Sequence, residues 1–185
     1  GSGLVGSEMC IRDSPMLDLK GLVPEERIQA LIDLIVARGG LIKNLHGQKN
    51  VYYQVNATYY SALGADDRKM LLARAIQLFM PGKPQVWYLD LFAGKNDLEA
   101  VHRGGEAAHK EINRTNLTSE QVKAGLEQPV TRDQIKLLRL YNGCPAFDGE
   151  LTVEQPETHR LCLRWRKGDS QASLDADLRT LAFTA

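Results

Sequence analysis

A helix, a tight turn and a short apolar segment, consecutive within residues 63–114, constrain the fold of this chain more than any other feature. Apolar residues recur with helical spacing up to Phe79, and Pro81 and Gly82 then end the helix. The apolar segment at 85–89 has the continuous pattern of a strand that is buried on both faces. A polar loop follows it. This order predicts an α/β fold in which functional residues lie on the loop beyond the strand.

Composition narrows the classes of protein to consider. The chain has 185 residues, of which 43% are hydrophobic and 25% charged, so it can bury a core. Lys+Arg and Asp+Glu each number 23, so no basic excess favours nucleic acid. No apolar run approaches the length of about 18 residues that a membrane span needs. Cys10, Cys144 and Cys162 have no metal-type spacing and indicate reduced thiols. We therefore expect a cytoplasmic protein with no membrane or nucleic-acid partner, and the sequence leaves its oligomeric state open.

The helical part of the chain is predicted from periodicity and capping residues. Residues 1–14 have no period, and we expect a linker or an artefactual leader there. Gly39 and Gly40 are expected to end the first helix, and a polar loop is expected at 41–50. Asp66 or Asp67, and later Asn96 or Asp97, are candidate helix caps. Helices are expected at 24–38, 66–79, 97–102, from about 119, and at 131–141, the last with Ile135, Leu138 and Tyr141 facing inward.

The pattern changes at Phe147, after which apolar and polar residues alternate. The alternating apolar positions are Leu151, Val153, Leu161, Leu163, Trp165, Ala172, Leu174 and Ala176. Such alternation is typical of antiparallel strands with one buried face, and 167–170 predicts a hairpin turn. This tail is too short to be stable alone, so we expect it to pack on the helical part.

Five stretches of the sequence together resemble one known family. They are 19–24 (LKGLVP), 53–64 (YQVNATYYSALG), 81–88 (PGKPQVWY), 93–99 (AGKNDLE) and 146–149 (AFDG). In this order they strongly resemble the C-terminal part of sucrose phosphorylase and its close relatives in glycoside hydrolase family 13. The resemblance covers the chain from about Leu17 to its end.

The resemblance implies a fold and a domain organisation. The expected fold is the C-terminal part of a (β/α)8 barrel with an active-site loop insertion, followed by a small antiparallel β domain. On this reading, 15–64 form the loop and helix insertion. Residues 65–146 hold the last strand and helices of the barrel, and 147–185 form the β domain.

The resemblance also implies an activity. The family transfers glucose from sucrose to phosphate with retention, giving α-glucose 1-phosphate and fructose, and it needs no cofactor or metal. Two carboxylates about 5–5.5 Å apart carry out such chemistry. In the family, the nucleophile, the acid/base and a third, stabilising Asp all precede the segment matched by 19–21. We therefore expect no catalytic residue in this chain and no activity from it alone.

The resemblance assigns candidate substrate-binding residues to two segments. Tyr53 and Gln54 match a mobile loop that shapes the acceptor and phosphate site; the alternative is an aromatic packing position beside a helix start. His109 and Lys110 match the loop after the last barrel strand, where sucrose phosphorylases typically have Gly and an Arg that helps to hold the glucosyl unit. Lysine cannot reproduce the bidentate guanidinium. The alternative for this segment is a solvated polar loop.

Departures from the family pattern bear on the acceptor. His46 lies in the acceptor loop, and Val51 stands where sucrose phosphorylases usually have Asp. Together with Lys110, these residues favour an anionic acceptor, although a solvated loop remains the alternative. Three readings follow: a sucrose-phosphorylase-type enzyme acting on a disaccharide and phosphate, a relative acting on sucrose 6′-phosphate or glucosylglycerate, and a non-catalytic structural fragment.

Two further patterns in the sequence are expected to be structural. Asp97 and Glu99 are not expected to form a catalytic carboxylate pair, because two residues apart on a helix they diverge. Asn-X-Thr triplets begin at Asn56, Asn113 and Asn116, and we expect them to be unmodified.

Overall fold

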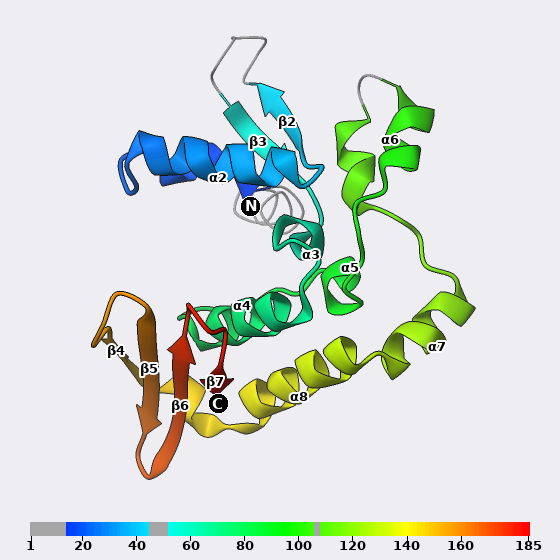
Figure 1. Cartoon of the computed structure of the whole chain (residues 1–185). Helices are drawn as coiled ribbons and strands as arrows, with labels where there is room; N and C mark the ends of the chain where they lie inside the picture. The colour runs from blue at the N-terminus through cyan, green and yellow to red at the C-terminus, as the bar shows by residue number, and fades with distance from the viewer. Residues whose placement is uncertain (1–13, 45–51, 106–107) are drawn as a thin grey trace, which may run out of the picture. The chain divides into compact units, whose positions relative to one another are not determined.

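The computed structural model describes residues 14–44, 52–105 and 108–185. These divide into two compact units. The first unit contains the described residues up to Ala65 together with Gln85–Val122, and the second contains Asp66–Pro84 and Lys123–Ala185. Figure 1 labels the α-helices and the strands from β2 to β7.

The first unit is built on a three-stranded antiparallel sheet with the order β1-β3-β2. Its elements are β1 (Ser14–Pro15), η1 (Met16–Leu19), α2 (Glu25–Ala37), β2 (Leu41–Asn44), β3 (Tyr52–Asn56), α3 (Tyr59–Ala62), α5 (Tyr88–Leu91), α6 (Leu98–Gly104) and η3 (His109–Asn113). Helix α2 packs Ile32 and Ile35 against Met16 and Val55, which closes a small apolar core. Figure 1 shows α2 beside β2 and β3.

Local signals determine both ends of α2, as expected. Glu25 and Glu26 occupy the first turn, where the helix dipole favours negative charge. Gly39 has φ +83°, a conformation that side-chain-bearing residues rarely adopt. A Cβ at Gly40 would lie 2.6 Å from Cγ2 of Ile35, so only glycine fits there. The predicted stop at these two glycines is confirmed.

The loop predicted at 41–50 is wrong at its start. Leu41–Asn44 form β2, which pairs with β3 through partners such as Ile42 and Val55. Ile42 packs against the α2 core. The strand depends on partners that lie 8 to 15 residues further along the chain, which local composition does not reveal. The remainder of this stretch, 45–50, lies outside the described residues.

The strand predicted at 85–89 is also wrong. Trp87 has an extended backbone (φ −71°, ψ 140°), but α5 begins at the next residue, Tyr88. A strand requires a neighbour on the ladder, and all pairings between named strands of the described residues are antiparallel and lie elsewhere. Instead, the indole Nε1 of Trp87 donates to the carbonyl oxygen of Asn113 at 3.0 Å. The hydroxyl of Tyr88 donates to the carbonyl oxygen of Thr115 at 2.6 Å.

The second unit packs two helices against a four-stranded antiparallel sheet with the order β4-β5-β6-β7. Its elements are α4 (Asp67–Phe79), α8 (Pro129–Gly143), η4 (Pro145–Asp148), β4 (Glu150–Glu154), β5 (Arg160–Lys167), β6 (Ser170–Asp177) and β7 (Phe183–Thr184); α7 (Ser119–Glu127) begins in the first unit and ends in the second. Phe79 of α4 packs with Leu163, Trp165 and Leu174 of the sheet. In Figure 1, α4 lies beside both α8 and this sheet. The predicted strands, the hairpin and the packing of the tail on helices are confirmed.

The inward face of α8 agrees with the prediction only in part. Ile135, Leu138 and Tyr141 are half-buried, as are Leu137 and Leu140, and the ring of Tyr141 packs on that of Phe147 with the centroids 4.8 Å apart. Gln134 is fully buried, and its Oε1 accepts from Nε of the buried Arg74 of α4 at 2.9 Å. This buried polar pair lies on the inward face of α8, and apolar periodicity alone does not detect it. Leu137 and Leu140 also pack on the core.

Two carboxylates should make the second unit sensitive to acid. Asp66 caps α4, and hydrogen bonds from the backbone N–H groups of Lys69 and Arg68 lower its pKa. Asp177 is held in the same way by the N–H groups of Thr180 and Arg179, which lowers its pKa. Because both folded-state pKa values lie below the unfolded value of 3.8, their stabilisation is present above that pH and is lost as pH falls through the folded values.

We therefore expect the melting temperature of the chain to fall as the solution is acidified below the ordinary carboxyl pKa. In the variant Asp66→Asn combined with Asp177→Asn, the fall should be shallower. Thermal melts followed by circular dichroism across this pH range provide the measurement. Equal acid slopes for the two proteins would contradict the prediction.

Within the described ranges, none of the helices combines the length and apolarity that crossing a membrane requires. The same ranges contain no group of three or more His, Cys, Asp or Glu side chains arranged to hold a metal ion.

Candidate functional site

The first unit brings together the two segments that carry the predicted substrate-binding residues. Tyr53 and Gln54 lie on β3, whereas His109 and Lys110 lie on η3, and η3 contacts both β2 and β3. His109 and Lys110 are half-buried. His46, like Val51, falls outside the described residues.

A bulge lies beside Tyr53. The pairing of β2 with β3 passes from Lys43 opposite Gln54 to Asn44 opposite Tyr52, so Tyr53 is skipped in the register. Bulges bend the strand, redirect side chains and are frequent beside active sites. The backbone irregularity therefore falls on the residue that was predicted to contact the acceptor.

A row of buried polar side chains follows this bulge. Gln54, Asn56 and Thr58 are each at most 1% exposed, while Val55 between them packs in the apolar core. Neither amide atom of Asn56 has a hydrogen-bond partner among the described residues. Burying an amide without a partner costs on the order of 1–3 kcal/mol, so such groups are rare in structural roles alone. Asn56 is therefore a further candidate residue for the site on this face of β3.

Helix η3 is attached to the end of β3 and to the loop before α6. Asn113 is 2% exposed, and its Nδ2 donates to the carbonyl oxygen of Ala57 at 3.3 Å. The backbone N–H of Asp97 donates to the carbonyl oxygen of Ile112 at 2.9 Å. These contacts place Lys110 on a short helix that is fixed at its C-terminal end.

The loop before α6 contains two polar residues with distinct roles. Asp97 caps α6, because its Oδ1 accepts from the N–H of Ala100 at 2.8 Å. Its Oδ2 accepts from Oγ1 of Thr115 at 3.0 Å. Glu99 is exposed, and its Oε2 lies 3.7 Å from Nη1 of Arg103 in an ion pair on the surface of α6. The expectation that Asp97 caps a helix is confirmed, and both of its oxygens are engaged in structural hydrogen bonds.

Asn96 does not cap the helix. Its Oδ1 accepts from the backbone N–H of Thr58 at 2.7 Å, and its Nδ2 donates to the carbonyl oxygen of Gly39 at 3.1 Å. Its backbone N–H donates to Oγ of Ser61 at 2.9 Å. Asn96 therefore links the end of α2, the end of β3 and the start of α3.

Tyr88 supports the same region from α5. Burial raises the pKa of its phenol, and the hydroxyl donates to the carbonyl oxygen of Thr115. The same Thr115 donates its hydroxyl hydrogen to Asp97. The segment that follows η3 is thus anchored by neutral and charged hydrogen bonds.

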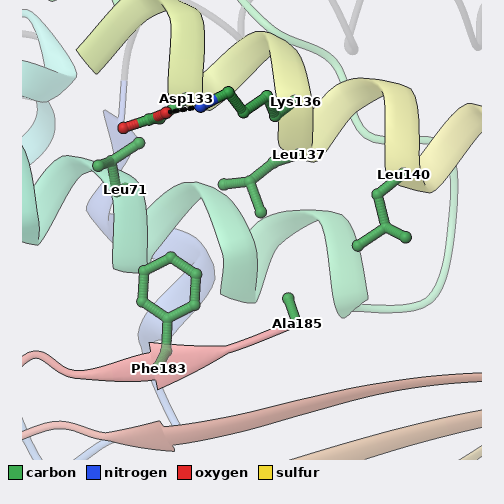
Figure 2. Close-up of a pocket in the computed structure, with 7 residues that line it drawn as sticks. All are labelled: Leu71, Asp133, Lys136, Leu137, Leu140, Phe183 and Ala185. Atoms are coloured by element: carbon green, nitrogen blue, oxygen red, sulfur yellow. Dashed lines mark hydrogen bonds and ion pairs between the residues drawn. The ribbon is translucent and has the colours of Figure 1, made fainter. Parts of the chain in front are cut away.

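The second unit contains a pocket of about 400 Å³ that has a different chemistry. Figure 2 shows its lining from α4, α8 and the C-terminal strand: Leu71, Asp133, Lys136, Leu137, Leu140, Phe183 and Ala185. The polar groups in this lining pair with each other, because Nζ of Lys136 donates to Oδ1 of Asp133 at 2.7 Å. None of the predicted site residues lies there, so the face around β3 and η3 remains the candidate site.

Asn56, Asn96 and Asn113 were not predicted as site residues. Two of them begin Asn-X-Thr triplets, and the burial of Asn56 and Asn113 means that these triplets are not available for glycosylation. Asn56 and Asn96 lie in two of the stretches that carry the family resemblance.

Comparison with known proteins gives a consistent result. The chain is 53% identical over 184 residues to a sucrose 6(F)-phosphate phosphorylase from Ilumatobacter coccineus, a match that covers 95% of this chain and 35% of the relative. It is 36% identical to a sucrose phosphorylase from Bifidobacterium adolescentis, over 84% of this chain and 31% of the relative. No protein-family model matches.

A solved structure supports the same relationship. The crystal structure of sucrose 6F-phosphate phosphorylase from Thermoanaerobacter thermosaccharolyticum matches with a TM-score of 0.84 and 38% identity, over 90% of this chain and 35% of that one. The chain thus spans about a third of the length of the relatives it matches. It is a homologue of the sucrose phosphorylases and corresponds to their C-terminal part, with helices and antiparallel sheets arranged as in that part.

Proposed function

We propose that this homologue of the sucrose phosphorylases forms the acceptor side of an enzyme that phosphorolyses sucrose 6F-phosphate, the 6′-phosphate of sucrose. The reaction would transfer glucose with retention to inorganic phosphate, giving α-glucose 1-phosphate and fructose 6-phosphate. The observation that carries this proposal is the 53% identity to a sucrose 6(F)-phosphate phosphorylase over 95% of the chain. Plain sucrose, the substrate in the name of the Bifidobacterium relative, is the first alternative.

The residues on β3 and η3 would bind the acceptor and phosphate. Lys110 supplies a compact positive charge, which suits the phosphate ester of an anionic acceptor. His109 lies beside it, and Tyr53 and Gln54 stand at the bulge of the neighbouring strand. We also assign His46, which lies outside the described residues, to binding of the same acceptor.

Bond breaking would be carried out elsewhere in the longer enzyme. Retaining transfer requires a nucleophile and an acid/base about 5–5.5 Å apart. Asp97 is used as a helix cap and Asp90 accepts from the backbone N–H of Tyr59 at 3.1 Å, so neither acidic residue is assigned this role. We accordingly assign residues 15–64 to an active-site insertion, 65–146 to the end of a (β/α)8 barrel and 147–185 to a β domain, with 1–14 as a linker.

The proposed chemistry needs only the disaccharide and inorganic phosphate, with no cofactor, metal, nucleic acid or membrane. Phosphorylated sugars do not cross bilayers unaided, which favours a cytoplasmic location. A second candidate substrate is glucosylglycerate, also anionic, which appears in the name of a relative from Spirochaeta thermophila that is 30% identical to this chain. If the chain acts only as a structural fragment, no such substrate would be turned over.

A chimaera tests the proposal. The part of the Ilumatobacter coccineus relative that precedes the matched region is joined to residues 15–185 of this chain, and the intact relative is measured in parallel. We expect phosphate-dependent release of α-glucose 1-phosphate from sucrose 6F-phosphate, with a kcat/KM above those for sucrose and glucosylglycerate. Preference for plain sucrose would overturn the proposed acceptor. A folded chimaera that acts on none of the three substrates would overturn the proposed enzyme class.

A further inference from the structure

We propose that Asn96 is a positioning residue that fixes the end of β3, and with it the acceptor-side residues Tyr53 and Gln54, in their working geometry. The role in turnover rests on the function proposed above. Asn96 itself need not touch substrate. It would act through the strand that it anchors.

The hydrogen bonds around Asn96 close a ring. Its Oδ1 accepts from the N–H of Thr58, the Oγ1 of Thr58 accepts from the N–H of Ser61 at 3.2 Å, and the Oγ of Ser61 accepts from the N–H of Asn96. Thr58 lies two residues after the end of β3 and is 1% exposed. A closed ring of this kind leaves the end of the strand little freedom to shift.

The second amide group of Asn96 extends the ring to α2. Its Nδ2 donates to the carbonyl oxygen of Gly39, the left-handed residue just after this helix. The amide therefore has to accept on one side and donate on the other. Aspartate at this position would keep the acceptor for Thr58 but would set a carboxylate oxygen against the carbonyl of Gly39. Alanine would remove both bonds.

The loop that holds Asn96 also reaches the second site segment. The next residue, Asp97, donates its N–H to the carbonyl oxygen of Ile112 in η3. Adjacent residues of one loop thus attach β3 and η3, the two elements that carry the candidate binding residues. A Cβ at Gly94 would lie 2.9 Å from Cδ2 of Leu89, so the start of this loop is also sterically fixed. The loop that contains Asn96 and Asp97 therefore holds the end of β3 and η3 in fixed positions relative to each other.

Steady-state kinetics of the chimaera test the role in turnover. Asn96→Ala is expected to raise the KM for phosphate by about tenfold and to change kcat less. The variant would displace groups that bind substrate, whereas the groups that break the bond belong to another part of the enzyme. Asn96→Asp, which keeps the acceptor for Thr58, should recover part of that loss. The matched control is Asp66→Ala, which removes the cap of α4 in the other unit and should lower the melting temperature without changing KM. Equal KM values for Asn96→Ala and this control would overturn the proposal.

Hydrogen–deuterium exchange tests the positioning without any need for activity. In the chain itself, Asn96→Ala should speed exchange in peptides that cover 54–61 relative to peptides from β5 and β6. Unchanged exchange in 54–61 would overturn the proposal whatever the chimaera does.

If the unchanged chimaera is active and only the Asn96 effect is missing, the positioning role fails and the proposed function stands. If exchange responds but the unchanged chimaera is inactive, the proposed function fails and the anchoring of β3 stands.

Discussion

Replacing Phe79 with alanine is expected to lower the free energy of unfolding of the second unit by about 3–5 kcal/mol. Phe79 is 1% exposed, at the last turn of α4. Its ring meets that of Phe147 edge-on, with the centroids 4.9 Å apart. Its carbonyl oxygen accepts from Nε1 of the buried Trp165 at 2.8 Å. Removing the ring therefore opens a cavity where α4, η4 and β5 meet.

Denaturant unfolding followed by circular dichroism and tryptophan fluorescence measures this loss. Met80→Ala is the matched control, because Met80 follows Phe79 directly, is similar in size and is 48% exposed. We expect that control to change the free energy of unfolding by about 0.5 kcal/mol or less. Equal losses for the two variants would contradict the assignment of Phe79 to the core.

Reversing the charge of Lys110 is expected to raise the KM of the chimaera for sucrose 6F-phosphate by about tenfold or more. This is on the order of the loss of binding affinity that follows when one partner of a close charge pair is removed. Lys110 is half-buried on η3, so its field is less screened than that of a fully exposed lysine. In Lys110→Glu a carboxylate would face the phosphate ester, and repulsion would replace attraction. The KM for plain sucrose, which has no phosphate, should change much less.

Two variants separate a local effect from a change in net charge. Lys20→Glu makes the same reversal at a side chain that is 70% exposed before α2, and should leave both KM values near those of the unchanged chimaera. Lys110→Arg keeps the charge and should retain the preference for the phosphorylated substrate. A similar rise in KM for both substrates in Lys110→Glu would show that Lys110 does not recognise the phosphate ester.

Elements determined by neighbouring residues were predictable from the sequence. Gly39 ends α2 because it alone adopts the required backbone conformation, and Asp66 begins α4 because its carboxylate reaches N–H groups two and three residues away. Alternation from Leu151 to Ala176 predicted the C-terminal sheet, because one face of it is buried against α4. In each case the cause lies within a few residues or in a regular period.

Features that depend on distant partners were not predictable. The strand β2 forms because it pairs with β3. Residues 85–89 have the sequence pattern of a strand, but the side chains of Trp87 and Tyr88 instead donate hydrogen bonds to the carbonyl oxygens of Asn113 and Thr115. The burial of Gln134 on α8 involves a hydrogen bond from Arg74, sixty residues away in sequence. The same holds for the candidate site. The family resemblance assigned 53–54 and 109–110 to loops, whereas in the structure these residues lie on the strand β3 and the 3-10 helix η3. The contacts of Asn96 with residues 35 to 57 positions away also appear only in the structure.

Production of α-glucose 1-phosphate from sucrose 6F-phosphate, measured side by side for residues 15–185 alone and for the chimaera, decides whether this chain provides acceptor-side binding without a bond-breaking group. We predict no production above background from the chain alone and phosphate-dependent production from the chimaera. Production by the chain alone, or none from a folded chimaera, would contradict that division of roles.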